Sequence, residues 1–129
     1  NESIDFNWNT GPFIQYAYAR IQSLIRKEKF SNTKINLDTN INEKEKDILK
    51  QLTQFPIAVK SAADNYSPAL IANYAFELVK TFNSYYQSTT ILKINDLEIK
   101  NFRLTLSNKV GEVIKSSMKL LGVEVPEKM

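Results

Sequence analysis

The stretch "GPFIQYAYARIQSLIRK", which runs from Gly11 to Lys27, sets the periodicity that governs the rest of the chain. Its apolar side chains recur at steps of three and four residues, as they do on one face of an α-helix. Pro12 suits the first turn of such a helix. The pattern predicts an amphipathic helix from about Gly11 to about Lys29. Its apolar face consists of Phe13, Ile14, Ala17, Ile21, Leu24 and Ile25.

Few residues in the chain interrupt helices. Among 129 residues there are three glycines and four prolines, so long uninterrupted elements are expected rather than a sheet with many turns. The apolar fraction of 43% is ordinary for a globular protein, and the length suits one domain with one core. We expect an all-α bundle of about five helices. Residues 1–10 are expected to lead into a helical domain over residues 11–129.

Capping signals place the remaining helices. Asn42 followed by Glu45 has the spacing of a capping box. Ser67 and Pro68 form a cap and first-turn pair for a longer helix. Helices are therefore expected over residues 44–53, 56–65, 67–87 and 99–121, with a loop between the last two.

The composition excludes several kinds of chemistry. The chain has no cysteine and no histidine, which removes disulfides, thiolate zinc sites and every histidine-based nucleophile pair. Glu43, Glu45 and Asp47 alternate with lysines, a pattern typical of a solvated face, and no glycine-rich phosphate loop is present. We expect no catalytic residue, no metal site and no cofactor within this chain.

Charge and hydropathy set bounds on the partners. No apolar run approaches the roughly 20 residues of a membrane helix, and the opening "NESIDFNWNT" does not resemble a secretory signal. The net charge of +3 permits an anionic partner without requiring one. Because the chain begins with Asn1 rather than methionine, we expect a fragment or a processed product. A cytoplasmic protein without a membrane partner is expected.

The first helix carries a candidate binding stripe beside its apolar face. Tyr16 and Arg20 lie one turn apart there, and an aromatic ring and a guanidinium can stack on and hydrogen-bond to unpaired bases. Alternatively, Tyr16 shields the edge of the core and Arg20 pairs with a carboxylate. Arg26 and Lys27 form a basic cluster at the helix end. They either complement the helix dipole or contact phosphates.

Three further residues have unusual positions. Tyr86 falls inside the apolar arc of the long helix, where it is either a core residue or a buried ring with an outward hydroxyl. Arg103 falls inside the apolar arc of the last helix, and Asp64 and Glu77 are its expected partners. Trp8 is expected to cover the core, or else to contact a neighbouring domain.

Three segments together point to a family: "NTGPFIQYAYARIQSLIRK", "FPIAVKSAADNYSPALIANYAFELVKTFNSYY" and "RLTLSNKVGEVIKSSMKLLGVEVPEKM". They closely resemble the C-terminal anticodon-binding domain of arginyl-tRNA synthetases, often called the DALR domain. The resemblance runs from about Phe6 to Met129. Its opening Gly-Pro-aromatic-x-Gln-Tyr-x-x-x-Arg and closing Leu-Leu-Gly-x-x-x-Pro-Glu-x-Met look specific to the arginine enzymes, because the related cysteinyl domain does not end in this way.

The resemblance implies a helical bundle that grips the anticodon stem-loop of tRNA(Arg). The parent would be a class I synthetase that ligates arginine to tRNA with ATP and Mg. Its catalytic domain, with HIGH-like and KMSKS-like motifs, is absent from this chain, so this part alone should not aminoacylate tRNA. The implied partners are the tRNA(Arg) stem-loop and the chain's own catalytic domain, not DNA. Two alternatives stay open: a helical protein-interaction domain without RNA binding, or the anticodon domain of another class I synthetase such as the cysteinyl enzyme.

The resemblance also assigns residues. Tyr16 and Arg20 match the family's first-helix motif, which faces the anticodon loop, and Tyr86 matches the tyrosine that ends the long helix. Met129 matches the C-terminal methionine that closes the pocket for the middle anticodon base. Gln15 is a weaker addition to this site.

Two positions depart from the family pattern. Trp8 stands where the family commonly has a small residue, which affects the conformation of the segment before the first helix. Asn83 stands where the family often has a histidine, so any contact made by that histidine is not carried over to this chain. Neither departure changes the expected function.

Overall fold

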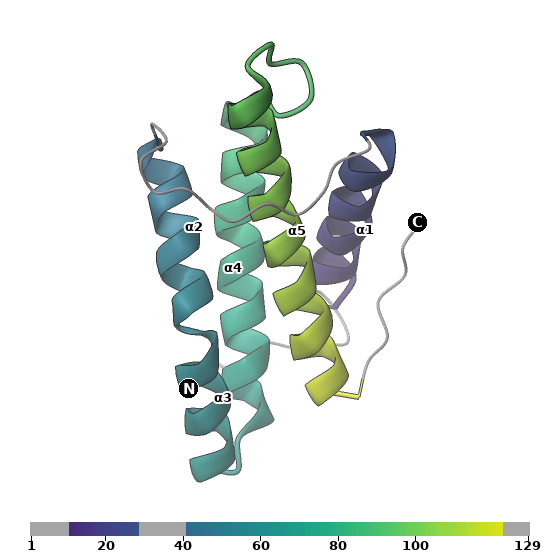
Figure 1. The fold of residues 1–129 in the computed structure, drawn as a ribbon. Coiled ribbons are helices and arrows are strands. Elements are labelled where there is room, and N and C mark those ends of the chain that lie inside the picture. Colours follow the sequence, from purple (N-terminus) through teal and green to yellow (C-terminus); the bar gives the residue numbers. More distant parts are fainter. Residues whose placement is uncertain (1–10, 29–40, 123–129) are drawn as a thin grey trace.

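The computed structural model describes residues 11–28 and 41–122. These residues form five helices and no strand (Figure 1). The all-α fold is therefore confirmed. Trp8 and Met129 lie outside the described residues, as does most of the segment between the first two helices. The helices are α1 (Gly11–Lys27), α2 (Glu43–Thr53), α3 (Phe55–Asp64), α4 (Pro68–Ser88) and α5 (Leu97–Leu120).

Local capping explains where the helices begin. The predicted capping box of α2 is present: the Glu45 N–H donates to Asn42 Oδ1 at 2.8 Å, and the Asn42 N–H donates to Glu45 Oε1 at 2.9 Å. Asp96 caps α5 by accepting from the backbone N–H groups of Glu98 and Ile99 at 3.0 and 3.2 Å. Because of this cap, α5 begins two residues earlier than the apolar pattern alone predicts.

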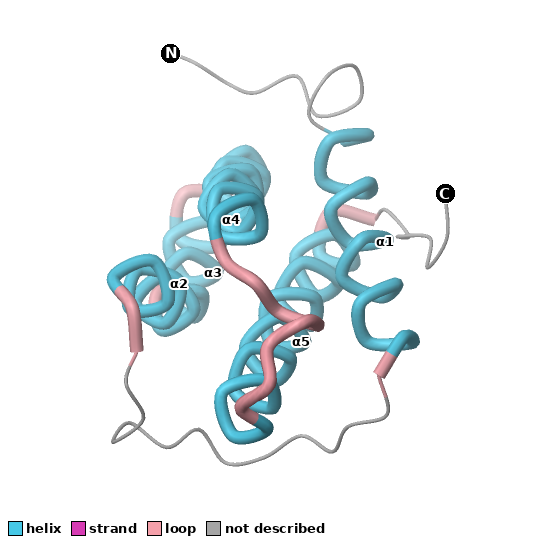
Figure 2. Tube along the Cα trace, turned by 90° about the horizontal axis from the view of Figure 1, so that it is seen from above, coloured by secondary structure: helices cyan, strands magenta, loops and turns pink. Residues whose placement is uncertain are grey.

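The helices surround the two longest ones, α4 and α5. Helices α2 and α3 are separated only by Gln54 and follow one another along one side of the bundle (Figure 1). Seen from above, α1 and α2 lie on opposite sides of α4 (Figure 2). Helix α1 contacts both α4 and α5, so one face of the bundle is built from α1 and α4 together.

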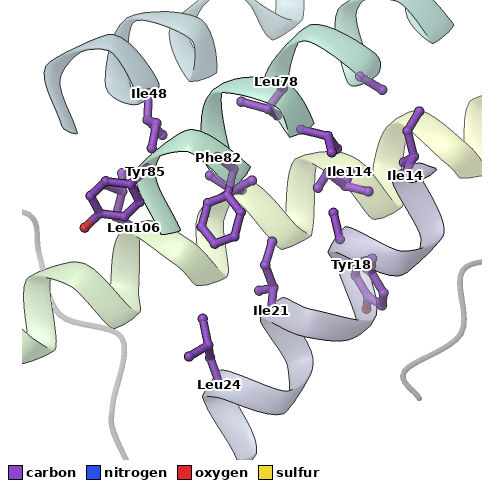
Figure 3. Packing of buried hydrophobic residues seen from close by; sticks show 14 of the residues in the cluster. Ile14, Tyr18, Ile21, Leu24, Ile48, Leu78, Phe82, Tyr85, Leu106 and Ile114 are labelled. Atoms are coloured by element: carbon purple, nitrogen blue, oxygen red, sulfur yellow. The ribbon is translucent and has the colours of Figure 1, made fainter. Parts of the chain in front are cut away.

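The core lies where α1, α2, α4 and α5 meet (Figure 3). Burying each large apolar side chain there contributes about 1.5–3 kcal/mol. At Gly111 of α5, an added Cβ would lie 3.1 Å from Ile21 Cγ2, so glycine allows α1 and α5 to approach closely. The fully buried core side chains include Ile14, Ile21, Ile48, Leu78, Phe82, Tyr85, Leu106 and Ile114.

The structure corrects the predicted inner face of α4. Tyr85 is fully buried, whereas Tyr86 is only partly buried at the edge of the core. The sequence-based prediction placed Tyr86 in the core because it assumed that α4 has a single buried face. All four other helices contact α4, so its buried sector is wider than one face and includes Tyr85. The large apolar side chains of Ile57 in α3 and Leu120 in α5 are exposed.

The predicted solvated face of α2 is wrong at Glu45, which is 1% exposed. Its carboxylate accepts a hydrogen bond from the Tyr85 hydroxyl at 2.7 Å and from Arg103 Nε at 2.9 Å. Glu45 lies three residues before the buried Ile48 and therefore shares its inward face. Burial, followed by the contact with Glu45, raises the pKa of Tyr85, so its hydroxyl keeps its proton and donates.

The partners predicted for Arg103 are also wrong. Arg103 binds Glu45 and donates from Nη1 to the Thr90 carbonyl at 2.7 Å. Asp64 and Glu77 instead pair with lysines of their own helices, at exposed positions. The helix spacing identified a buried cation, but it could not identify which of the other helices would supply the anion.

Candidate nucleic-acid interface

Tyr16 and Arg20 lie on the side of α1 that faces α4. They flank the fully buried residues of α1, so their stems are held by the bundle while their ends reach its surface. Tyr16 is 60% exposed, and Arg20 is partly buried. An exposed aromatic ring beside a guanidinium is a surface on which another planar group can stack.

Tyr86 of α4 completes this group. The guanidinium carbon of Arg20 lies 4.5 Å from the centre of the Tyr86 ring and 6.0 Å from that of Tyr16. These distances suit cation–π attraction. Tyr86 is itself supported by Phe82, whose ring centre lies 6.3 Å away. The structure therefore brings together three residues predicted as one site, although Tyr86 follows Arg20 by more than sixty positions in the sequence.

Asn83 joins the group, although the prediction did not assign it to the site. Its side-chain oxygen accepts a hydrogen bond from Arg20 Nη1 at 3.3 Å. Within residues 11–28 and 41–122, Arg20 forms no ion pair with a carboxylate. The signal that could have found Asn83 is its spacing, three residues before Tyr86 and so one turn away on the same helix face.

A hollow of about 410 Å³ opens beside Arg20. Tyr16 and Tyr86 contribute aromatic walls, and Ser23 contributes a hydroxyl. The exposed Arg26 and Lys27 line it at the end of α1, so the predicted basic cluster adjoins the stacking residues. The complete lining is Tyr16, Ala19, Arg20, Ser23, Leu24, Arg26, Lys27 and Tyr86.

The other two predicted residues, Gln15 and Met129, have different outcomes. Gln15 is partly buried on α1 and does not line it. Met129 lies outside the described residues, so its assignment stays a prediction. The structure thus brings together Tyr16, Arg20, Tyr86 and the basic pair.

The site offers stacking and hydrogen bonding rather than groups for covalent chemistry. Across the described ranges, no cluster of three or more acidic, histidine or cysteine side chains could hold a metal ion. Among the helices described above, none is both long and apolar enough to cross a membrane. Unpaired nucleobases are read through stacking on aromatic and guanidinium planes, and this arrangement provides both.

Several known proteins are similar to this chain in sequence. The family described as "DALR anticodon binding domain" matches residues 14–129. The arginine–tRNA ligase of Flavobacterium psychrophilum is 52% identical over 128 residues, covering 99% of this chain and 21% of that protein. The arginine–tRNA ligase of Parabacteroides distasonis is 48% identical over 132 residues, covering 99% of this chain and 22% of that protein.

A solved structure agrees with these matches. The arginyl-tRNA synthetase of Thermus thermophilus superimposes with a TM-score of 0.86 at 28% identity, over 97% of this chain and 22% of that one. The chain thus spans about one fifth of the length of its curated relatives. Since the family match covers most of the sequence, the chain belongs to the DALR anticodon-binding domain family.

Proposed function

We propose that the face between α1 and α4 binds unpaired bases of the anticodon loop of tRNA(Arg). The observation that carries the proposal is the position of Arg20, which packs against Tyr86 and near Tyr16 at the edge of the core and hydrogen-bonds to Asn83. Such a guanidinium can stack on one base and donate to the edge of another. The similarity to arginine–tRNA ligases supports the choice of tRNA(Arg).

The parts of the face have different roles in this proposal. Each base stacked on Tyr16 or Tyr86 contributes about 1–3 kcal/mol. Arg26 and Lys27 contact backbone phosphates, which position the loop without reading its sequence. Met129 is proposed to close the hollow over the middle anticodon base, and Gln15 to make a weaker contact.

The chain is proposed to act as the C-terminal part of an arginyl-tRNA synthetase in the cytoplasm. The remaining part of such a parent would bind ATP and Mg and would carry out the ligation of arginine. The residues of this chain position the anticodon and take no part in the bond-forming step. Their catalytic partner is the parent's own nucleotide-binding domain.

The proposal is tested by titrating the chain with two anticodon stem-loops at two salt concentrations. One stem-loop has the tRNA(Arg) anticodon, and the other differs only in its middle base. We expect tighter binding of the first, and weaker binding of both at higher salt, because phosphate contacts release counterions. Equal, salt-insensitive affinities would instead indicate a protein-interaction domain. Repeating the titration with a full-length parent would show whether any failure reflects the missing domain.

A further inference from the structure

The residue before Tyr86 lies in different surroundings from Tyr86 itself. Tyr85 is fully buried, and its hydroxyl donates to Glu45 of α2. The ring of Tyr86 instead faces Arg20 of α1. Successive residues of an α-helix are about 100° apart around its axis, because each turn contains 3.6 residues. A rotation of the last turn of α4 that draws Tyr85 away from α2 therefore also moves the ring of Tyr86 relative to α1.

Glu45 joins this turn of α4 to α5. Its Oε2 accepts from the Tyr85 hydroxyl at 2.7 Å and from Arg103 Nε at 2.9 Å. Arg103 also donates from Nη1 to the carbonyl of Thr90 at 2.7 Å, just beyond the end of α4. The side chains of Glu45 and Arg103 are only 1% and 15% exposed, so removing either partner would be costly. These bonds hold the chain on both sides of Tyr86.

The local sequence does little to fix the end of α4. The last turn, residues 85–88, contains no glycine, proline or basic side chain. Thr89 follows it in an extended conformation, with φ −129° and ψ 130°. Helices commonly end at a left-handed glycine or with cations near their last carbonyls, and helix ends tend to fray. The buried hydrogen bonds of Tyr85 and Arg103 thus supply a restraint that the local sequence lacks.

Phe82 provides a second link between the two tyrosines. It is fully buried, and its ring centre lies 6.1 Å from that of Tyr85, beside it in the core (Figure 3). The ring centre of Tyr86 lies 6.3 Å from that of Phe82. Close-packed interiors transmit small displacements, because few voids can absorb them. A shift of the Tyr85 ring is therefore passed to Tyr86 through Phe82 as well as through the backbone.

We propose that the buried hydrogen bonds of Glu45 with Tyr85 and Arg103 hold Tyr86 in the position in which it binds a base. The three are positioning residues, because none of them lines the hollow beside Arg20. The effect on RNA rests on the proposed function, whereas the position of Tyr86 in the free chain does not. If a variant aligns Tyr86 only about a tenth to a third of the time, the apparent affinity falls about three- to tenfold.

The test needs a change that spares the core. Tyr85→Phe removes only the hydroxyl and keeps the buried ring. Tyr74→Phe is the matched control, because the Tyr74 hydroxyl also joins α4 to α2, by donating to the Gln51 carbonyl. It lies about three turns before Tyr86. Circular dichroism and denaturant unfolding establish that each variant is folded under the assay conditions.

Arg103→Lys tests the other half of the network. Lysine keeps the positive charge, but its single ammonium lacks the planar fork that donates to Glu45 and to the Thr90 carbonyl together. We therefore expect it to release the end of α4 while leaving Tyr85 chemically intact.

The first readout is the NMR signal of the Arg20 Nε–H group in the free chain. An aromatic ring shifts the resonances of protons that lie over its face, and the Tyr86 ring centre is 4.5 Å from the Arg20 guanidinium carbon. Arg20→Lys identifies the signal by removing it, and Tyr86→Ala gives its position without the ring. Tyr85→Phe and Arg103→Lys should move the signal towards that position, and Tyr74→Phe should not. An unchanged signal in Tyr85→Phe would overturn the inference.

The second readout is affinity for the tRNA(Arg) anticodon stem-loop, measured as a double-mutant cycle. We expect Tyr85→Phe to weaken binding about three- to tenfold and Tyr74→Phe to leave it unchanged. In a Tyr86→Ala background, Tyr85→Phe should have no further effect, because the residue that it positions is gone. The same loss in both backgrounds would indicate a merely structural role and would overturn the inference. If the unmodified chain binds no stem-loop, the proposed function fails, and the Arg20 signal alone decides whether the network positions Tyr86.

Discussion

Replacing Arg20 separates a role of its charge from a role of its planar shape. Arg20→Ala removes both, whereas Arg20→Lys keeps the charge but loses the planar group that packs on Tyr86. In the free chain the change removes a cation–π contact of about 0.5–1 kcal/mol and a hydrogen bond of about 0.5–1.5 kcal/mol. The free energy of unfolding should therefore fall by about 1–2.5 kcal/mol, which leaves the fold intact.

The loss in RNA binding should be of similar or larger size. One stacked and hydrogen-bonded base contributes about 1–3 kcal/mol, which corresponds to about 5- to 150-fold in affinity. We expect Arg20→Ala to weaken binding of the tRNA(Arg) anticodon stem-loop by this factor. Arg20→Lys should recover only a small part of the loss, because an ammonium cannot stack or donate in the same plane.

The assay is a fluorescence titration of a labelled stem-loop at two salt concentrations, after denaturant unfolding has confirmed that each variant is folded. Lys115→Ala removes one positive charge from an exposed position of α5 and serves as the matched control. Wild-type affinity in Arg20→Lys would refute the stacking role and leave only a charge effect. Wild-type affinity in Arg20→Ala would remove Arg20 from the site altogether.

Three further predictions concern stability. Glu45→Ala should lower the free energy of unfolding by about 3–5 kcal/mol in denaturant titrations, because Arg103 then loses the partner of its largely buried charge. The same change at the exposed Glu43 should cost far less, and similar losses in the two variants would contradict the role of the buried ion pair. Tyr66 has φ 50° and is 94% exposed, so Tyr66→Gly should stabilise the chain by about 0.5–1 kcal/mol. An unchanged or lower denaturant midpoint of unfolding would show that the backbone at Tyr66 is not strained. Burial raises the pKa of Tyr74 from 10.0 to about 12, so the unfolded chain loses this proton first. The contribution of Tyr74 to stability should be constant below about pH 10 and should fall as pH rises towards 12; stability that stays flat from pH 10 to pH 12 would disagree.

Features set by neighbours in sequence were predictable. The capping box of Asn42 and Glu45 and the amphipathic α1 depend on contacts within a few residues, so the sequence pattern contains them. The pairing of Tyr16 with Arg20 follows from helix spacing for the same reason. The resemblance added Tyr86, which lies on another helix and has no local link to α1.

Features set by packing between helices were not predictable in this way. The sequence around Glu45 is that of an exposed charged helix, and its burial follows only from the packing of α4 and α5, which supply Tyr85 and Arg103 as its partners. Tyr85, rather than the predicted Tyr86, lies in the core because several helices contact α4 and widen its buried face. Asn83 becomes part of the site only because Arg20 reaches it across the α1–α4 contact.

The central claim is that the α1–α4 face is where the anticodon loop binds. The most direct test is an NMR titration of the isotope-labelled chain with the tRNA(Arg) anticodon stem-loop, followed residue by residue. The account predicts that chemical-shift changes concentrate around Tyr16, Arg20 and Tyr86 and fade towards α3. Changes that gather on α3 and the turn at Tyr66, with the α1–α4 face unperturbed, would contradict it.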